Sequence, residues 1–553
     1  MRTLRVAELI AGIFFALLSI TFGAHDAAAQ AGNVYITPDG SGQGACTASP
    51  QNPSWFNNSG NWGNGANQIG PGTTVHLCGV FNGAAGSTLL SFQGSGASGN
   101  PVTLVFESGT QLNSPAWSGS GAIATNGKSF IKIDGKNNGV IQNTANGDSL
   151  SNRSISTLIN AYSCSGCTIQ NLTLANVYVA VRGTTNVLGG PMTQMNSIAF
   201  SGSNWTISGN TIHDCGWCLY NVFGNGDTNI QISNNEIYNW DHAFMFATSG
   251  ANAASNLFFH DNNLHDNLNF ETTGCTYHLD GMHFFGTSGS SMSGIYVYNN
   301  WFHGSLSGPC SSGFIFMEGG SGTPSHASNT NWWNNVFDAS GSAGANANGW
   351  VGIFSGESGS TVFVNNTMVG TSGGDMNVCY NIKAVNNLTF ENNVVNNCGI
   401  QMGLGNLTGS ILVDYNVYGN SCQNGANCFV FNGAFQGNFT TWKSALKGAG
   451  ISGADAHSTF NLTPNLSAAG IPSASYVGSE WGANLSSLAT GQLSSLSGDT
   501  TQGDTRSAVG RPSGSCSTQP SAGCWSVGAY QISGNNAGAT PPNPPTSLSA
   551  TVN

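Results

Sequence analysis

The sequence predicts an all-β solenoid, a parallel β-helix with loops of different length inserted into its coils. A short phrase recurs along the chain: an apolar residue, two further residues, Asn, one residue and a second apolar residue. Examples are residues 207–212 (ISGNTI) and 232–237 (ISNNEI). β-Branched, aromatic and polar residues alternate around each copy, with no helical period. The 77 glycines suit short turns in place of the helical crossovers that parallel strands normally need.

The repeated asparagines are expected to stack in one column along the solenoid. They are 23 to 38 residues apart, which fits coils of constant cross-section with loops of variable length. An Asn at a turn tolerates the left-handed conformation, and side chains stacked about 4.7–4.9 Å apart can form an amide ladder. The positions are Asn210, Asn235, Asn262, Asn300, Asn335, Asn366, Asn393 and Asn416.

With these units the chain resembles the right-handed parallel β-helix superfamily, which has the pectate-lyase-like fold. The resemblance is strongest over residues 167–418, and the segments 102–106 and 130–135 resemble early coils. The segment 511–530 resembles the closing segment of secreted bacterial β-helix proteins. The resemblance implies a right-handed coil but no particular reaction, because one fold hosts many functions.

Residues 1–29 are expected to form a cleaved secretory signal peptide. Arg2 and Arg5 precede an apolar run over 9–22, and the small residues 27–29 suit cleavage. A membrane anchor is the alternative, but the run is short for a span. The prediction is a secreted or cell-surface protein, with no transmembrane helix in the mature chain.

Residues 30–535 are expected to form the β-helix domain. A chain of 553 residues is too long for one compact core, whereas the core of a solenoid can extend along its axis. Residues 536–553 predict a Pro-rich linker, and 547–552 resemble the first strand of a fibronectin-type module. The chain has 12 Lys plus Arg against 24 Asp plus Glu, a net charge of −12. Nucleic acid is therefore excluded as a partner, because phosphate binding needs a basic surface.

Fourteen cysteines in an exported chain predict disulfides between neighbours. The C-x-x-C at 215–218 has redox spacing, but a structural clip is favoured because no helix N-terminus follows it. A zinc site of Cys164, Cys167, Cys215 and Cys218 is the other alternative. The predicted pairs are Cys46–Cys78, Cys164–Cys167, Cys215–Cys218, Cys275–Cys310, Cys379–Cys398, Cys422–Cys428 and Cys516–Cys524.

Two segments with similar sequences predict the same strand in adjacent coils. Residues 241–250 (DHAFMFATSG) align without gaps to residues 280–289 (DGMHFFGTSG). Strand alternation then separates the small and Met positions from the His and Phe positions. We expect the former to face the core and the latter to face outward, and the reverse stays open because Phe is a natural core residue. The candidate substrate-binding residues are His242, Phe244, Phe246 and Phe285.

Carboxylates and imidazoles gather at the start of these strands, and residues 312–318 are expected to add the next coil. Sugars suit such a patch, because rings stack on apolar side chains while carboxylates bind hydroxyls. The sequence HLDGMH at 278–283 resembles one on the active face of several carbohydrate-active β-helix proteins. Turn capping and backbone hydrogen bonding are the structural alternative. The candidate catalytic residues are Asp241, His278, Asp280, His283 and Glu318.

A second polar column follows the asparagines by three residues and is expected to face outward. It predicts either a stacked polar ladder or a cation or sugar groove. Its members are His213, Tyr238, His265, His303 and Asp338.

Two reactions on a polysaccharide fit these residues. Hydrolysis needs two carboxylates, while elimination from a uronate needs a base and a group that neutralises the uronate. Pectate lyases of the resembled superfamily use calcium held by acidic residues and a basic side chain, but Arg153, Arg182 and Lys383 lie outside the patch. His283, His278 or Tyr277 could replace that base. A non-catalytic glycan-binding, adhesin or structural surface protein is the competing interpretation.

Overall fold

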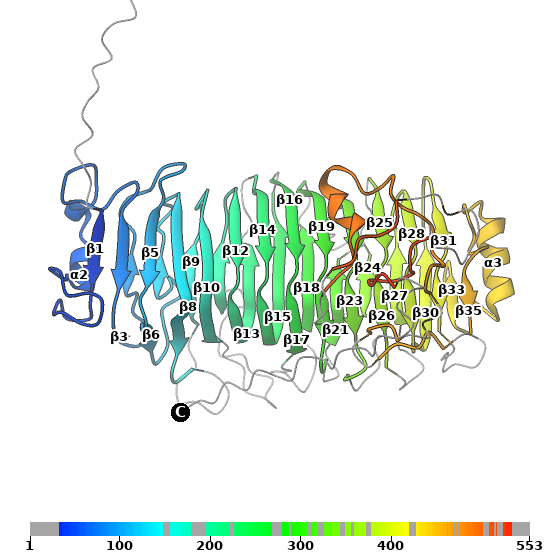
Figure 1. The fold of residues 1–553 in the computed structure, drawn as a ribbon, viewed down its shortest axis with the longest axis horizontal. Coiled ribbons are helices and arrows are strands. Elements are labelled where there is room, and N and C mark those ends of the chain that lie inside the picture. Colours follow the sequence, from blue (N-terminus) through cyan, green and yellow to red (C-terminus); the bar gives the residue numbers. More distant parts are fainter. Residues whose placement is uncertain are drawn as a thin grey trace, which may run out of the picture.

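The chain forms a parallel β-helix in the computed structural model. The residues described are 32–146, 155–177, 195–221, 226–250, 252–267, 279–286, 289–306, 311–318, 326–342, 349–354, 359–371, 378–419, 427–461, 463–467, 470–473, 476, 478–501, 508–513, 516 and 524–532. Their strands form one continuous 35-stranded sheet, in which the pairing is parallel except between β33 and β34. The sheet winds about the long axis (Figure 1), which confirms the predicted all-β, right-handed parallel β-helix.

The sheet has three faces, each made by strands that stack one coil on the next. Face 1 contains β1 (Asn33–Ile36), β2 (Thr74–Leu77), β5 (Val102–Phe106), the first parts of β8 (Ile131–Asn143) and β10 (Thr168–Val177), β12 (Trp205–Ser208), β14 (Thr228–Ser233), β16 (Ala253–His260), β19 (Ser291–Tyr298), β22 (Ala327–Trp333), β25 (Thr361–Val364), β28 (Leu388–Glu391) and β31 (Leu412–Asp414).

Face 2 contains β3 (Val80–Asn82), β6 (Gln111–Ser114), the second parts of β8 and β10, the first parts of β13 (Thr211–Asn221) and β15 (Glu236–Thr248), β17 (Asn263–Asn267), β20 (Trp301–His303), β23 (Val336–Asp338), β26 (Thr367–Val369), β29 (Val394–Asn396), β32 (Val417–Tyr418) and β35 (Thr459–Phe460).

Face 3 contains β4 (Leu90–Ser91), β7 (Ile123–Ala124), β9 (Thr157–Ala161), β11 (Asn196–Phe200), the second parts of β13 and β15, β18 (Leu279–Gly286), β21 (Ser311–Met317), β24 (Val351–Ile353), β27 (Val378–Lys383), β30 (Ile400–Gly405) and β33 (Phe429–Phe431). Strand β34 (Ala434–Gln436) forms a hairpin with β33.

The repeated asparagines stack in one buried column at the turn between faces 1 and 2, as predicted. The side-chain amide of Asn262 donates to Oδ1 of Asn300 at 3.0 Å, and the Asn262 backbone N–H donates to the same oxygen at 3.0 Å. The same two bonds join each neighbouring pair from Asn210 to Asn416. The left-handed residue of each turn is the one before the ladder Asn, such as Asn299 with φ of 53°, and not the ladder Asn itself as expected.

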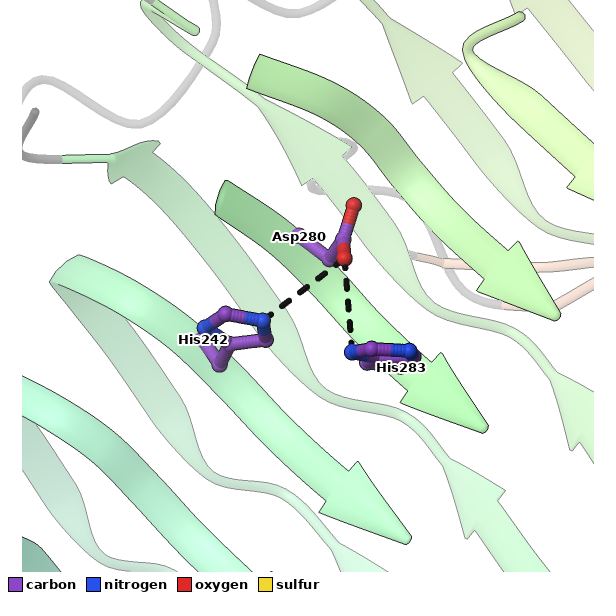
Figure 2. Close-up of side chains that lie close together, drawn as sticks. All are labelled: His242, Asp280 and His283. Carbon is purple, nitrogen blue, oxygen red and sulfur yellow. Dashed lines mark ion pairs between the residues drawn. The ribbon is translucent and has the colours of Figure 1, made fainter. Parts of the chain in front are cut away.

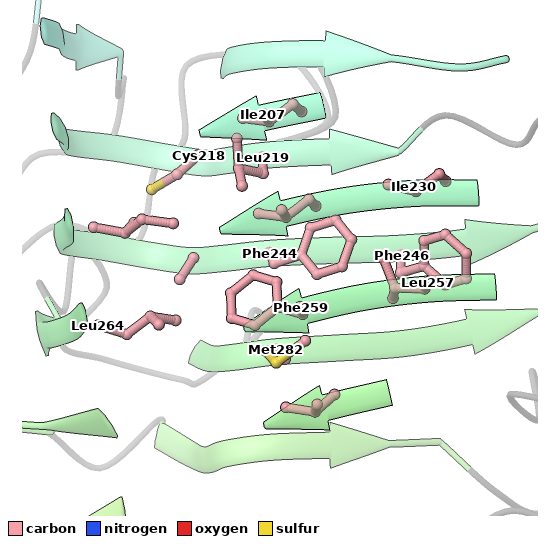
Figure 3. Packing of buried hydrophobic residues seen from close by; sticks show 14 of the residues in the cluster. Ile207, Cys218, Leu219, Ile230, Phe244, Phe246, Leu257, Phe259, Leu264 and Met282 are labelled. Atoms are coloured by element: carbon pink, nitrogen blue, oxygen red, sulfur yellow. The ribbon is translucent and has the colours of Figure 1, made fainter. Parts of the chain in front are cut away.

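One apolar core runs through the coils, and Figure 3 shows Phe244, Phe246 and Met282 inside it. Phe244 and Phe246 are 0% and 1% exposed, so the prediction that they face outward and bind substrate is wrong. The reverse orientation, which the sequence left open, applies to the Phe244–Phe246 part of β15, where Met245 points outward, whereas Met282 and Phe284 of β18 lie in the core as predicted. Burying the two large rings contributes more to stability than leaving them in water.

Short helices cover both ends of the core. Phe56 packs edge-on against Phe92 at the N-terminal end. Trp442 stacks on Phe429 at the other end, where Figure 1 shows α3 closing the coil. The helical elements are α2 (Pro53–Phe56), η1 (Ser59–Asn61), α3 (Phe439–Gly448) and η3 (Gly491–Ser497).

The described part of residues 463–532, here the C-terminal strap, runs back along the outside of faces 1 and 2 (Figure 1). Trp525 packs in one cluster with Trp333 of β22, and Tyr530 packs in another with Val336 of β23. The strap therefore covers apolar side chains that point outward from the coil.

Five of the predicted disulfides are confirmed. They are Cys46–Cys78, Cys164–Cys167, Cys215–Cys218, Cys379–Cys398 and Cys516–Cys524. Because both C-x-x-C-like pairs are closed as local clips, the alternative zinc site is wrong. Cys275, Cys310 and Cys422 lie outside the described residues, so their pairings stay predictions.

The expected signal peptide and the Pro-rich linker also lie outside the described residues. Within the described part of the chain, no helix is long and apolar enough to cross a membrane.

Candidate functional site

The candidate site lies on the outer side of face 3, where β15, β18 and β21 are neighbours. His242 pairs with Asp280, and Met245 pairs with His283. The gapless alignment, which places Asp241 beside Asp280, is wrong by one residue. A shift of one residue exchanges the inward and outward positions of a strand, because side chains alternate along it.

This register explains the buried phenylalanines. Phe244 pairs with Met282, and Phe246 pairs with Phe284, so all four side chains point into the core. Ala243 belongs to the core as well, so strict alternation is interrupted just after His242. His242 can therefore turn its ring toward the residues of β18.

Gly281 allows β18 and β21 to approach closely beside Asp280. A Cβ at Gly281 would lie 2.4 Å from the backbone carbonyl oxygen of Phe314. The Asp-Gly pair is thus part of a strand interior, where glycine marks a close approach of backbones rather than a turn.

Two histidines, one from β15 and one from β18, converge on one carboxylate oxygen of β18 (Figure 2). Nε2 of His242 and Nδ1 of His283 each lie 3.6 Å from Oδ2 of Asp280. The two imidazole rings are nearly parallel, with centroids 5.5 Å apart and an interplanar angle of 21°. Asp280 is fully buried, and His242 and His283 are 3% and 4% exposed.

Two further carboxylates hold the other nitrogen of each ring. Nδ1 of His242 makes a short hydrogen bond to Oδ1 of Asp241. Nε2 of His283 lies 3.1 Å from Oε1 of Glu318, which follows β21. The Glu318 side chain is 22% exposed, so it is where this cluster meets solvent. The structure thus brings together four of the five predicted catalytic residues and His242, while His278 lies outside the described residues.

Aromatic side chains surround the cluster on the outer surface of face 3. The rings of Phe285 and Phe316 lie 5.3 and 5.1 Å from that of His283, and the ring of Trp217 meets His242 edge-on at 5.8 Å. Phe285 also packs with Trp217 and Tyr220 in one apolar group. Burial, together with the nearby Tyr162, raises the pKa of Tyr220 far above its usual value, so its hydroxyl stays neutral.

The sequence predicted Phe285 in this group but missed Trp217, Tyr220 and Phe316. Trp217 lies within the C-x-x-C segment 215–218, and the sequence of β13 near Trp217 is not similar to that of β15. Its pairing with His242 is a signal that only the register supplies.

The donor atoms of the cluster can be compared with those that calcium requires. Among the described residues, His242, Asp280 and His283 can each offer one ligand atom, all within 4.8 Å of one another. Calcium prefers oxygen ligands alone. Two imidazoles and one carboxylate oxygen do not match that preference, so this group does not fit the calcium site that the resemblance implies.

The second column of polar residues forms a stacked ladder on the outside of face 2. His213 stacks on Tyr238 at 4.7 Å, Tyr238 on His265 at 5.1 Å, and His265 on His303 at 5.0 Å. Asp338 is the next position of this column. Both ring nitrogens of His265 face carboxylates, those of Asp266 and Glu236, but the described ion pairs show no second imidazole at either carboxylate oxygen, unlike Asp280 in the face 3 cluster.

No family model matches this chain, and no curated protein matches it. Solved structures that are similar to it include a pectate lyase and a tailspike protein. Pectate lyase Pel9A matches with 11% identity and a TM-score of 0.34, over 66% of this chain and 80% of that one. The Dettilon tailspike protein matches with 14% identity and a TM-score of 0.24, over 65% of this chain and 62% of that one.

Proposed function

We propose that the protein is secreted and cleaves an extracellular polysaccharide on the outer side of face 3. The observation that carries the proposal is the pair of His283 and Glu318, which lies beside half-buried aromatic side chains on one face. A charged group that reaches solvent next to apolar rings suits a sugar, whose ring stacks while its hydroxyls bond.

The aromatic side chains extend along the axis and would hold several sugar units. They come from coils between β9 and β21, a distance of about 24 Å at about 4.8 Å per coil. A sugar chain laid parallel to the axis would thus meet aromatic side chains in several coils. The half-buried members are Tyr162, Trp217, Phe285 and Phe316, and the buried Tyr220 packs with the first three of them.

Glu318 is the group placed to move a proton. Hydrolysis requires two carboxylates on either side of the scissile bond. Asp241 and Asp280 are buried against imidazoles, which leaves Glu318 as the carboxylate of this cluster that meets solvent. The arrangement therefore favours elimination from a uronate. Glu318 takes the proton beside the uronate carboxylate, a carbon–carbon double bond forms, the bond to the leaving sugar oxygen breaks and that oxygen takes a proton from water, while His283 positions Glu318.

The test is to incubate the protein with acidic and neutral polysaccharides from plants, algae and bacteria. We expect absorbance from unsaturated uronate products with an acidic substrate. Glu318→Gln should lower the rate about 10²–10⁴-fold, as expected for loss of a proton-transfer group. Asp261→Asn is the matched control, since it changes another histidine–carboxylate pair, that of His260 on face 1, and should cleave at the wild-type rate.

The competing function is non-catalytic glycan binding, which the aromatic side chains alone would support. Retention of the wild-type protein on a glycan column without any product would establish binding and contradict cleavage. New reducing ends without unsaturated product would show that the reaction is hydrolysis and not elimination.

A further inference from the structure

We propose that His242, Asp280 and His283 form a binding site for one divalent first-row transition metal ion such as zinc. The inference concerns the same cluster as the proposed function. A role of the ion in catalysis would depend on the proposed function. The binding of the ion does not, because it follows from the donor geometry.

Two of the three separations between the donor atoms are close to the edge of a tetrahedron around a zinc ion. The distance of 3.6 Å from each imidazole nitrogen to Oδ2 of Asp280 is too long for a hydrogen bond. Two ligands each about 2.0–2.1 Å from a tetrahedral zinc ion are roughly 3.4 Å apart. The two imidazole nitrogens lie within 4.8 Å of each other, so the rings would move closer together around one ion, and the remaining coordination position is left for water or a substrate oxygen.

The outer carboxylates hold both rings in the orientation that a metal site needs. Histidine ligands in metal sites usually direct their second nitrogen to a carboxylate, which fixes the tautomer and makes the ligand more basic. Asp241 does this for His242, and Glu318 does it for His283. Each ring thus directs its other nitrogen toward Asp280.

The His265 ring shows that this arrangement is specific to the cluster. Nδ1 of His265 bonds Asp266 at 2.9 Å, and its Nε2 lies 3.5 Å from Glu236. Two carboxylates stabilise this ring, but no second imidazole shares either oxygen with it in the described pairs. His265 is therefore a control that also has two carboxylate neighbours, although its side chain is 18% exposed and that of His242 is 4% exposed.

The donor set also indicates which ions would bind. Imidazole nitrogens suit zinc, copper, nickel, cobalt and iron, while magnesium and calcium prefer oxygen ligands. A divalent ion would in addition balance part of the negative charge that Asp241, Asp280 and Glu318 bring together. We therefore expect zinc and cobalt to bind and calcium not to compete.

The test is metal binding by the untagged full-length secreted chain after treatment with a chelator. Wild-type protein should take up one Zn²⁺ per chain in equilibrium dialysis. Co²⁺ should give a visible absorption band that Zn²⁺ removes and Ca²⁺ does not. No described cysteine is free, so the thiolates of the described residues would not account for such binding.

The variants assign the ion to this cluster. Asp280→Asn and His242→Gln should each weaken binding at least about 100-fold, and Asp241→Asn about 10–100-fold through loss of the outer carboxylate. His265→Gln should bind as the wild type does. Circular dichroism of the metal-free variants checks that they fold, and His283→Gln replaces any variant that does not.

Wild-type protein that binds no stoichiometric metal would overturn the proposal, and so would full binding by both Asp280→Asn and His242→Gln. Cleavage by metal-free protein, with no metal taken up, would sustain the proposed function alone. Metal uptake without cleavage of any polysaccharide would sustain the metal site and contradict the proposed function.

Discussion

At the scale of single residues, the histidines differ in what faces their second nitrogen. An imidazole bonded to an adjacent aspartate occurs repeatedly, in the pairs Asp241–His242, His213–Asp214, His260–Asp261 and His265–Asp266. His242 differs from the others in this set because the carboxylate oxygen that meets its Nε2, that of Asp280 on the next coil, also lies 3.6 Å from a second imidazole, that of His283. Whether two such residues meet depends on the exact register of the two strands. The sequence of a strand with loops on both sides does not determine that register.

His265 is expected to stabilise the fold through its protonation. Burial disfavours its charge, but hydrogen bonds to Asp266 and Glu236 outweigh burial and raise the pKa of His265 to about 9. Since this pKa lies above the ordinary value of 6.5, the stabilisation is fully present below about pH 6.5 and is lost as the pH rises through about 9. His265→Gln should lower the free energy of unfolding by about 1–3 kcal/mol at pH 6 and much less at pH 10, measured by urea denaturation.

The neighbouring His303 gives an internal check of this prediction. Burial and the charge of His265 lower the pKa of His303 to about 3. Histidine resonances in NMR spectra should therefore show His265 charged and His303 neutral at pH 7. Equal free energies of unfolding for His265→Gln and wild-type protein at pH 6 would contradict the prediction.

At the scale of elements, the sequence determines the turns better than the strands that carry the site. The ladder asparagines repeat in the sequence because each must bond the next, so their column and the strands of faces 1 and 2 could be predicted. Face 3 has no such marker. The number of residues between the strands of faces 2 and 3 differs from coil to coil, so the pairing of His242 with Asp280 could not be derived from the repeat. The gapless alignment therefore placed Phe244 and Phe246 on the outer side of the strand instead of the inner side.

Replacing a central ladder residue should destabilise the coil. The Asn300 amide donates to the carbonyl of Phe259 at 2.9 Å, and its oxygen accepts two bonds from Asn262. Asn300→Ala leaves these buried groups without their partner and should lower the free energy of unfolding by about 1–3 kcal/mol in urea denaturation. The control is Asn113→Ala, whose half-exposed amide bonds other amides on the surface of face 2, and which should change stability by less than about 1 kcal/mol. Equal effects of the two variants would contradict a structural role of the ladder.

At the scale of the whole molecule, the coil is quasi-one-dimensional and the C-terminal strap is the exception. Each coil contacts mainly its neighbours, whereas the strap joins residues more than a hundred positions apart. Face 3, with the candidate site, lies on a different side from the strap. We therefore expect the strap to stabilise faces 1 and 2 without covering the site.

Arg511 is the residue on which the strap depends most. Its guanidinium, only 7% exposed, donates to the carbonyl oxygens of Ser526, Gly528 and Ala529 and to Oδ1 of Asn334. Arg511→Ala leaves several buried acceptors without a donor and should lower the free energy of unfolding by about 3 kcal/mol or more.

In hydrogen exchange of this variant, amides of the strap and of the strands beneath it should lose protection. Those of β15 and β18 should keep theirs, and polysaccharide cleavage should persist. Lys447→Ala, an exposed change on α3, should leave the exchange pattern as in the wild type. Loss of protection over the whole coil would show instead that the strap and the site unfold together.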